Sequence, residues 1–552
     1  MRFQIKKQKW KAILLIALFA CAIPAAYSAT LTVINLADTG TGSLRQALAD
    51  NASLGGGNTI IFSNGLSGTI TLLSAELTVS APVSIQGPGP NLLVISGNHN
   101  KRVFTISAGP TQLSGLTIRD GVIIGAAGSP GTDGMDAHGG AILNQSTLTL
   151  ANCIVLSNSV VGGIGGTRNL GTVGNGGAGL GGALYSSGGN LFISNCTFLN
   201  NSSSGGSGAG GAGDGGNGGN ALGGAIYLLG GTNQITASSF ISNSTLGAPG
   251  GISTNGGIAG TRGLAYGGGL YNESSLVIFS STISGCSAGG AVIGSSTGNG
   301  YGGAIYNGMD LALYSSTIAS NSVSGSSFDA GGGIYNVGPA ALGITNCTIA
   351  ANQSDFGGGI NGNATVGGTI IALNNAPTGP DVNGTINSSD YNLIQNSGGL
   401  SLAGAIAHVI VGLNPLLGPL QNNGGPTFTM ALQSGSPAID QGKSFGFLTD
   451  QRGIPRPFDI ASLTNAPGGD GSDIGAYEFI PAPTLNIQSA ANNKVILFWS
   501  TNSGDARLQS ATNISATTNW ADVTNSRVYV GNTAYVTNSS AGARKFYRLV
   551  LP

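Results

Sequence analysis

Short apolar segments recur along the middle of the chain, and each copy presents its residues in the same order. A glycine pair followed by an apolar residue occurs seven times, and five of the copies continue with tyrosine. Apolar and polar positions then alternate with a period of two, which indicates short strands that each bury one face. Strands this short cannot bury that face alone, so the repeats must stack on one another.

The second half of each repeat aligns without gaps in six copies. The first apolar column holds Leu150, Ile193, Ile235, Ile278, Leu313 and Ile344. A column of small residues follows three positions later: Cys153, Cys196, Ser238, Ser281, Ser316 and Cys347. The next apolar column holds Val155, Phe198, Phe240, Ile283, Ile318 and Ile349. Coiling these strands pairs each one in parallel with its copy one rung away, so the pattern predicts an all-β chain built as a right-handed parallel β-helix.

A polar column closes each repeat. It holds Asn158, Asn201, Asn243, Asn321 and Asn352, with Cys286 in the place of one asparagine. Stacked asparagines form side-chain amide ladders, and asparagine tolerates the left-handed backbone of a turn. We therefore expect a structural ladder at a turn of the coil, interrupted at Cys286.

The repeats differ in length because of tracts rich in Gly, Asn and Ser. The shortest repeat, from Gly332 to Gly358, has 26 residues, whereas the span from Gly139 to Gly181 has 42. The excess falls in tracts such as 162–180 and 203–222, which predict mobile loops that project from one corner of the coil.

Further rungs precede Gly139, where residues 69–85 and 91–121 carry alternating apolar segments. An open coil end exposes unpaired strand edges and needs a cap. Residues 43–48 have helical spacing, and Ser43 is a candidate N-cap residue, so this segment is expected to form the cap.

The first residues predict export. A positively charged stretch precedes an apolar run at residues 12–20, and Ala26-Tyr27-Ser28 offers a cleavage site for a signal peptide of residues 1–29. Leu18-Phe19-Ala20-Cys21 also resembles a lipoprotein signal, in which Cys21 would carry the only membrane attachment. The protein is expected at the bacterial cell surface, in the outer membrane or extracellular.

Composition narrows the partners. The 552 residues include 97 glycines, charged residues make up 7%, and the net charge is −1. Nucleic-acid binding requires clustered Lys and Arg, which are absent after the first dozen residues. The cysteines are widely spaced without a CxxC motif or a nearby His cluster, so a zinc site is not expected, and the chain is predicted to carry no cofactor. A monomer is expected, with polysaccharide or a cell-envelope component as its partner.

The opening Ser43-Leu44-Arg45-Gln46-Ala47-Leu48 resembles the SLREA opening of bacterial surface β-helix proteins. The Gly-Gly-Ala-Ile-Tyr-Asn repeats are similar to those of polymorphic outer-membrane proteins and autotransporter β-helices. Five later motifs resemble the choice-of-anchor Q domain in order: Asn414-Pro415-Leu416-Leu417, 423–427, 435–440, 450–453 and 473–478. The resemblance implies a surface or secreted protein of adhesive type and carries no catalytic residues.

These observations divide the chain into four parts. A signal peptide at residues 1–29 precedes the capped coil at 30–400, and an anchor-type domain at 401–480 closes the coil. Residues 481–552 alternate short strand-like segments with Asn, Ser and Gly turns, which predicts a small β-sandwich. This tail is similar to fibronectin-III-like modules.

β-Helices often carry polysaccharide-active enzymes, so lyase or glycoside hydrolase activity is the alternative to a binding role. Such sites need clustered carboxylates, and the only tight group in the coil is Asp133, Asp136 and His138 in a glycine-rich insert. We interpret that group as a solvated loop and expect no catalytic residues. A third possibility is a structural stalk that displays the tail.

A tyrosine column is the candidate binding feature. It holds Tyr185, Tyr227, Tyr271, Tyr306 and Tyr335, and each follows an inward apolar residue, so each points outward. Exposed rings could stack on sugars, or the rings could stack on one another and on the inserts. Both alternatives stand at this point.

Two further groups are expected to be structural. Cys153 and Cys196 have parallel side-chain directions and serve as small fillers without a disulfide. The anchor-type domain carries Asp440, Asp450, Arg452, Arg456, Asp473 and Glu478. An ion-pair network is the favoured interpretation for that set and calcium binding the alternative. The sequence thus favours an exported, non-catalytic repeat protein with an adhesive or glycan-binding face.

Overall fold

The computed structural model describes residues 29–168, 172–290, 292–293, 296–501, 506–515, 519–540 and 544–550. The predicted leader, apart from its last residue, and Cys21 lie outside the described residues. The chain divides into two units, which meet in sequence between Glu478 and Phe479. Among the described residues, no helix is long and apolar enough to span a membrane.

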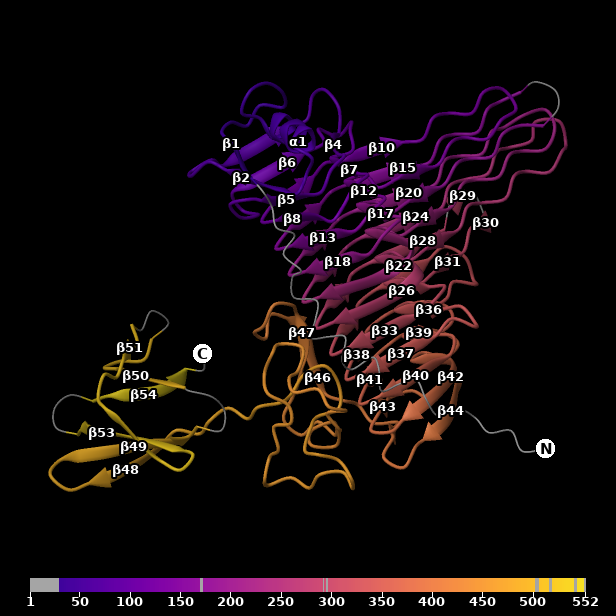
Figure 1. The fold of residues 1–552 in the computed structure, drawn as a ribbon. Helices are drawn as coiled ribbons and strands as arrows, with labels where there is room; N and C mark the ends of the chain where they lie inside the picture. Colours follow the sequence, from indigo (N-terminus) through magenta and orange to yellow (C-terminus); the bar gives the residue numbers. More distant parts are fainter. Residues whose placement is uncertain are drawn as a thin grey trace, which may run out of the picture. The chain divides into compact units, whose positions relative to one another are not determined.

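The first unit is a right-handed parallel β-helix, seen in Figure 1 as strands of successive rungs lying side by side. One rung consists of β12 (Ile142–Asn144), β13 (Leu148–Ala151), β14 (Ile154–Leu156), β15 (Ser159–Val161) and β16 (Gly179–Leu180). Strands of the β12 and β13 kind form a 20-stranded sheet, here called sheet A. Strands of the β14 kind form a 12-stranded sheet, here called sheet B, and the other two kinds form smaller sheets.

Residues that occupy one column of the sequence alignment lie next to one another on successive rungs of the coil. Leu150 pairs with Ile193, and Val155 pairs with Phe198, each one rung on. These side chains are buried, and the rings of Phe198 and Phe240 stack at 4.8 Å. Identical apolar residues therefore fill the interior, as the period of two predicts.

The turns differ in one respect from the prediction. The ladder asparagines do not adopt the left-handed backbone; the residue before each one does, as in Ser157 (φ 55°) before Asn158 and Asn200 (φ 52°) before Asn201. The turn thus directs the asparagine side chain into the coil, where it is buried. Assigning the left-handed conformation to the asparagines was wrong by one position.

The N-terminal end of the coil carries the predicted helical cap. β1 (Thr30–Val33) leads into α1 (Leu44–Ser53), which is followed by β2 (Asn58–Phe62). Ser43 is the N-cap, and its hydroxyl accepts a hydrogen bond from the amide of Gln46 at 3.2 Å. Leu44 and Leu48 join the interior of the coil, so the helix covers apolar groups that an open end would expose.

The glycine-rich inserts are paired by backbone hydrogen bonds. Their described residues are 125–136, 162–168, 172–178, 205–220 and 247–264, which project together from one corner of the coil (Figure 1). The amide of Gly163 donates to the carbonyl of Met135 (2.8 Å), and that of Gly166, three residues on, donates to Thr132 (2.9 Å). A period of three is that of an extended helix of the polyproline II type. The inserts project from one corner of the coil as predicted, and their described residues are joined by regular backbone hydrogen bonds, which the expectation of mobile loops did not include.

Glycine is needed in the inserts because their backbones approach one another without intervening side chains. A β-carbon on Gly206 would overlap the carbonyl oxygen of Gly163, and one on Gly219 would overlap that of Gly177. The glycines are therefore packing positions, and together they build a bundle of extended segments.

The coil runs further than residue 400. β44 (Leu400–Ala405) pairs with β42 (Val382–Ser389), and β45 (Ile410–Val411) pairs with β43 (Leu393–Ile394). The boundary predicted at 400/401 therefore falls inside the coil. The segment that follows, residues 412–478, is here called the anchor segment.

The anchor segment lies against the side of the coil, along sheet B (Figure 1). Gln451 is buried between them: its Oε1 accepts from the Thr317 hydroxyl (2.6 Å) and its Nε2 donates to that of Thr282 (2.8 Å). The outward side chains of sheet B are small there, and Ala319 and Ala350 pack on Met430. The segment thus docks laterally instead of only closing the coil end.

The second unit consists of two antiparallel sheets. One contains β48 (Asn486–Ala490), β49 (Lys494–Ser500), β53 (Thr533–Ser539) and β52 (Arg527–Val530). The other contains β51 (Ala521–Asp522), β50 (Arg507–Ala511) and β54 (Phe546–Val550). Trp499, Leu508 and Val536 are buried in one cluster with side chains from both sheets, which makes this unit a small β-sandwich.

Candidate functional site

The tyrosine column lies on the outer face of sheet A, and its rings stack on one another. Consecutive centroids along Tyr185, Tyr227, Tyr271, Tyr306 and Tyr335 are 5.1, 4.8, 4.8 and 5.6 Å apart. The angles between consecutive ring planes are 16° or less. Both faces of Tyr227, Tyr271 and Tyr306 are therefore covered by neighbouring rings, and the rings at the two ends have one face covered. This geometry favours the stacking alternative over sugar binding on the ring faces.

A second aromatic row supports the first from the side. Tyr266 meets Tyr306 edge to face at 5.0 Å, and the ring of His138 meets Tyr185 in the same way at 4.6 Å. Burial raises the pKa of Tyr227 and Tyr306 to about 12, so both hydroxyls stay neutral at physiological pH. The two rows together form a structural seam along the corner between sheet A and the inserts.

The asparagine column forms a buried ladder. The Nδ2 of Asn158 donates to Oδ1 of Asn201, and that of Asn201 donates to Asn243, both at 2.9 Å. After Cys286 the pattern resumes, since Asn321 donates to Asn352 at 2.9 Å. It then extends two residues beyond the predicted set, through Asn374 to Asp381. Each amide also bonds to main-chain groups, so these side chains satisfy the turns and are closed to a ligand.

Asp133 and Asp136, the carboxylates of the enzyme alternative, are engaged by the backbone of the inserts. The Oδ1 of Asp133 accepts from the amide of Asn175 (2.7 Å), and that of Asp136 accepts from Ala178 (2.6 Å). Asn175 repeats the arrangement one rung on, with the amide of Asn217 at 2.7 Å. Asp133 therefore begins a row of side-chain caps along the inserts, and Asp136 caps the single amide of Ala178, structural roles more specific than a solvated loop.

The predicted fillers in the small column are free thiols. Cys153 and Cys196 are both buried and unbridged. The amide of Cys153 lies 3.4 Å from the Sγ of Cys196, and the amide of Cys196 donates to the Ser238 hydroxyl at 3.1 Å. Thiol and hydroxyl thus occupy the same position here, and each faces the amide of the preceding rung as a small acceptor.

The charged residues of the anchor segment pair with one another. Arg456 and Glu478 form an ion pair of 2.7 Å, with both side chains fully buried. Asp450 forms an ion pair with Arg452 at 2.7 Å, and Asp440 accepts a hydrogen bond from the amide of Ile460 at 3.2 Å. Among the described residues, no group of three or more His, Cys, Asp or Glu side chains is placed to hold a metal ion. The contacts favour the ion-pair network.

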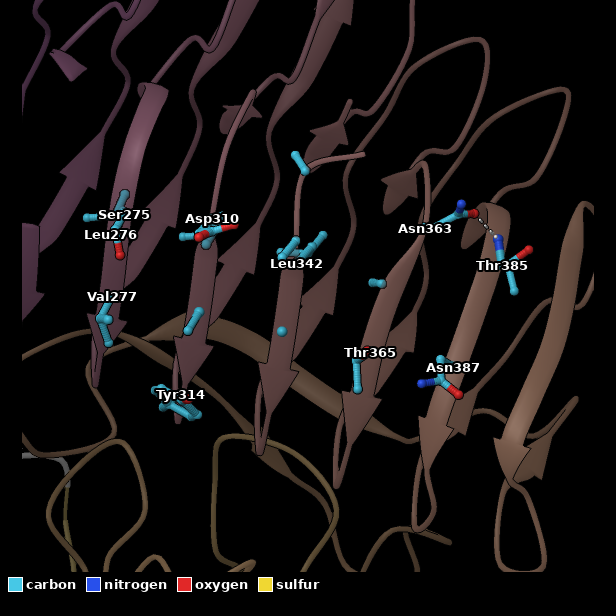
Figure 2. A pocket seen from close by; sticks show the side chains of 16 residues that line it. Ser275, Leu276, Val277, Asp310, Tyr314, Leu342, Asn363, Thr365, Thr385 and Asn387 are labelled. Atoms are coloured by element: carbon cyan, nitrogen blue, oxygen red, sulfur yellow. Dashed lines mark hydrogen bonds between the residues drawn. The ribbon is translucent and has the colours of Figure 1, made fainter. Parts of the chain in front are cut away.

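A groove that the sequence analysis did not predict lies on the outer face of sheet A. Its volume is about 550 Å³, and all of its lining residues fall within positions 275–387. It crosses β26 (Leu270–Phe279), β33 (Leu311–Tyr314), β37 (Leu342–Thr345), β40 (Ala364–Gly367) and β42. Figure 2 shows its side chains on successive strands.

Two rows of outward residues form the floor. The first is Val277, Ala312, Gly343, Thr365 and Asn387, each hydrogen-bond-paired in register with the next. The second, two residues earlier on each rung, is Ser275, Asp310, Ala341, Asn363 and Thr385. The hollow lies over Ala341 and Gly343, where the side chains of both rows are smallest. A β-carbon added to Gly343 would meet no atom within 4 Å, so the space above it is open.

Polar groups surround this small centre. Asp310 is exposed on one side, and on the other the Oδ1 of Asn363 accepts from the Thr385 amide at 2.9 Å (Figure 2). Tyr314 stands at the border of the groove and stacks on Phe279 at 4.8 Å. The groove therefore offers hydroxyls, amides, one carboxylate and a small apolar floor, a composition suited to a polar ligand with many hydroxyls.

The sequence does carry a signal for this groove. Along the first row, the earlier rungs hold Phe192 and Gln234, and the side chains then shrink to Ala312 and Gly343. That loss of volume on an outward column is meaningful only once the rungs are known to be neighbours in space.

A scan against protein-family models found no match. No curated protein matches the chain either. Among solved structures, the chain is similar to a mutant of AlyGC, an alginate lyase of the PL6 family, at 11% sequence identity and a TM-score of 0.21. The matched region covers 72% of this chain and 55% of the lyase, so the chain spans about half of that protein's length. At this identity and TM-score, the likeness says nothing about the activity of the chain.

Proposed function

We propose that this chain is an exported, non-catalytic protein that binds polysaccharide in the groove on sheet A. The observation that carries the proposal is the hollow over Gly343, which is open, elongated across five strands and lined by hydrogen-bonding side chains. Binding sites are concave and place a few polar groups around an apolar surface, and the groove has both features.

Binding without turnover is favoured by the carboxylates. Glycoside hydrolases use a pair of carboxyl groups on either side of the scissile bond. Asp310 is the single carboxylate among the described residues that line the groove. The nearby Glu273 accepts a hydrogen bond from the Tyr271 hydroxyl at 2.9 Å, and Asp133 and Asp136 are held by backbone amides of the inserts.

Export and surface location rest on the sequence. The charged and apolar leader precedes the mature chain, and the repeats and anchor motifs resemble those of bacterial surface proteins. A long coil that is held together by repeated short contacts is suited to present a binding face away from a cell.

The test is a polysaccharide binding assay on the protein purified after export, with released sugars measured in the same samples. Gly343→Leu fills the hollow, and the site has room for a side chain, so folding should be retained. We expect binding to fall by about tenfold or more, without product from either protein. Thr149→Leu, in the same outward column outside the groove, should bind as wild type. Equal binding by both variants, or release of product, would refute the proposal.

A further inference from the structure

We infer that the ligand of this groove is an uncharged glycan chain that lies along the coil axis, across the strands. The inference rests on the proposed function and adds to it the chemical class of the ligand and its direction. Both follow from the arrangement of the outward side chains on the five strands.

The direction follows from the register of the strands. Ala312 pairs with Gly343, and Gly343 pairs with Thr365, so the floor continues from rung to rung and not along any one strand. Neighbouring strands lie about 4.8 Å apart, so five of them span roughly 19 Å. An extended chain that lies across them can place about one sugar unit on each rung.

The lack of charge on the ligand follows from the absence of basic residues in this part of the sequence. The sequence contains no Lys or Arg between Arg262 and Lys443, a stretch that includes every residue lining the groove. A uronic acid or sulfated sugar would find no cation to pair with, and Asp310 would repel it. An acidic ligand would therefore lose hydration without recovering it from the protein.

The groups that are present suit hydroxyls. Carboxylates and amide oxygens accept hydrogen bonds from hydroxyls, which Asp310 and Asn387 can do from opposite sides of Gly343. Ser275 and Thr365 add groups that can donate or accept. Val277 and Ala312 supply small apolar patches for the C–H surfaces of a sugar ring.

The experiment titrates the protein purified after export with two series of oligosaccharides, each of two to six units. The neutral series comprises gluco- and manno-oligosaccharides, and the acidic series comprises oligogalacturonate and oligoalginate. Within the neutral series, we expect affinity to increase with chain length up to about five units. That affinity should change by less than about twofold as the salt concentration is raised. Acidic chains of equal length should bind at least about tenfold more weakly.

Two variants locate the effect. Gly343→Leu should weaken binding of the neutral chains by about tenfold or more, and Thr149→Leu should leave it unchanged. Asp310→Asn should narrow the difference between neutral and acidic chains, because it removes the repulsive charge and keeps a hydrogen-bonding group.

The outcomes separate this inference from the function on which it rests. Preferential, salt-sensitive binding of the acidic series would overturn the inference and leave polysaccharide binding intact. Neutral binding that is insensitive to Gly343→Leu would overturn the placement in the groove. Absence of binding to both series would overturn the proposed function together with the inference.

Discussion

The side-chain nitrogen of Asn243 lies 3.8 Å from the Sγ of Cys286, where its counterparts along the ladder make N–H···O bonds of 2.9 Å. Sulfur is a weak acceptor, so the ladder is weakened between two well-bonded halves. The amide of Cys286 still donates to Oδ1 of Asn321 at 2.9 Å, which keeps the backbone in register. The interruption is therefore confined to one side chain.

Cys286→Asn should complete the ladder and stabilise the coil. Gly269 faces this position and leaves room for the larger side chain, as Gly333 does for Asn352. The added bonds predict a gain of about 1 kcal/mol in the free energy of unfolding. Calorimetry on the purified protein measures the gain. Asn201→Ala, which breaks two ladder bonds, should shift the melting temperature in the opposite direction, and a destabilised Cys286→Asn would contradict the prediction.

Tyr227→Ala should lower stability and leave ligand binding unchanged. The Tyr227 ring is sandwiched between Tyr185 and Tyr271, so its removal deletes two stacking contacts, a loss of about 1 to 2 kcal/mol. Thermal unfolding and polysaccharide binding, measured on the same sample, separate the two effects. Weakened binding at an unchanged melting temperature would restore the sugar-binding interpretation of the tyrosine column.

Gly219→Ala should disrupt the paired inserts, because the new methyl group would overlap the carbonyl of Gly177. We expect the amides of Gly206 and Gly219, which are hydrogen-bonded in the bundle, to exchange with solvent at least about tenfold faster. Hydrogen-exchange mass spectrometry resolves this region. Gly343→Ala, where a β-carbon meets open space, is the matched control and should not alter exchange in the inserts.

Acid should loosen the N-terminal cap through Asp38. Burial alone would raise the pKa of this carboxyl, but hydrogen bonds from Ser74, Arg45 and Leu73 outweigh it and lower the pKa to about 2. A lowered folded-state pKa means that the stabilisation is present above about pH 4 and is lost as the pH falls towards 2.

The loss should amount to about 1 to 2 kcal/mol, since part of the ion pair with Arg45 is exposed. Hydrogen exchange of α1 between about pH 5 and pH 2 measures it, after correction for the intrinsic pH dependence of exchange. Asp38→Asn should be less stable at neutral pH and show a flatter profile. A wild-type profile in that variant would mean that another group controls the acid response.

The repeating part of this protein could be predicted from the amino-acid pattern. Inward residues such as Leu150 and Val155 are assigned by a period of two, and the copies define the register because identical side chains stack. The helical cap could be predicted from Ser43 and the spacing after it, since both signals are local. The direction of the tyrosines was likewise accessible, although whether they stack or bind was not.

Features that depend on contacts between residues far apart in sequence became visible only in the folded chain. Gln451 meets Thr317 across 134 positions, which places the anchor segment on the side of the coil. Gly219 meets Gly177 only when two inserts lie together, and backbone hydrogen bonds leave no side-chain pattern to read. The groove needs Ala312 and Gly343 to be neighbours. The groove is formed by small side chains on several neighbouring rungs, so no single repeat contains it. It exists only when the rungs are stacked in the coil.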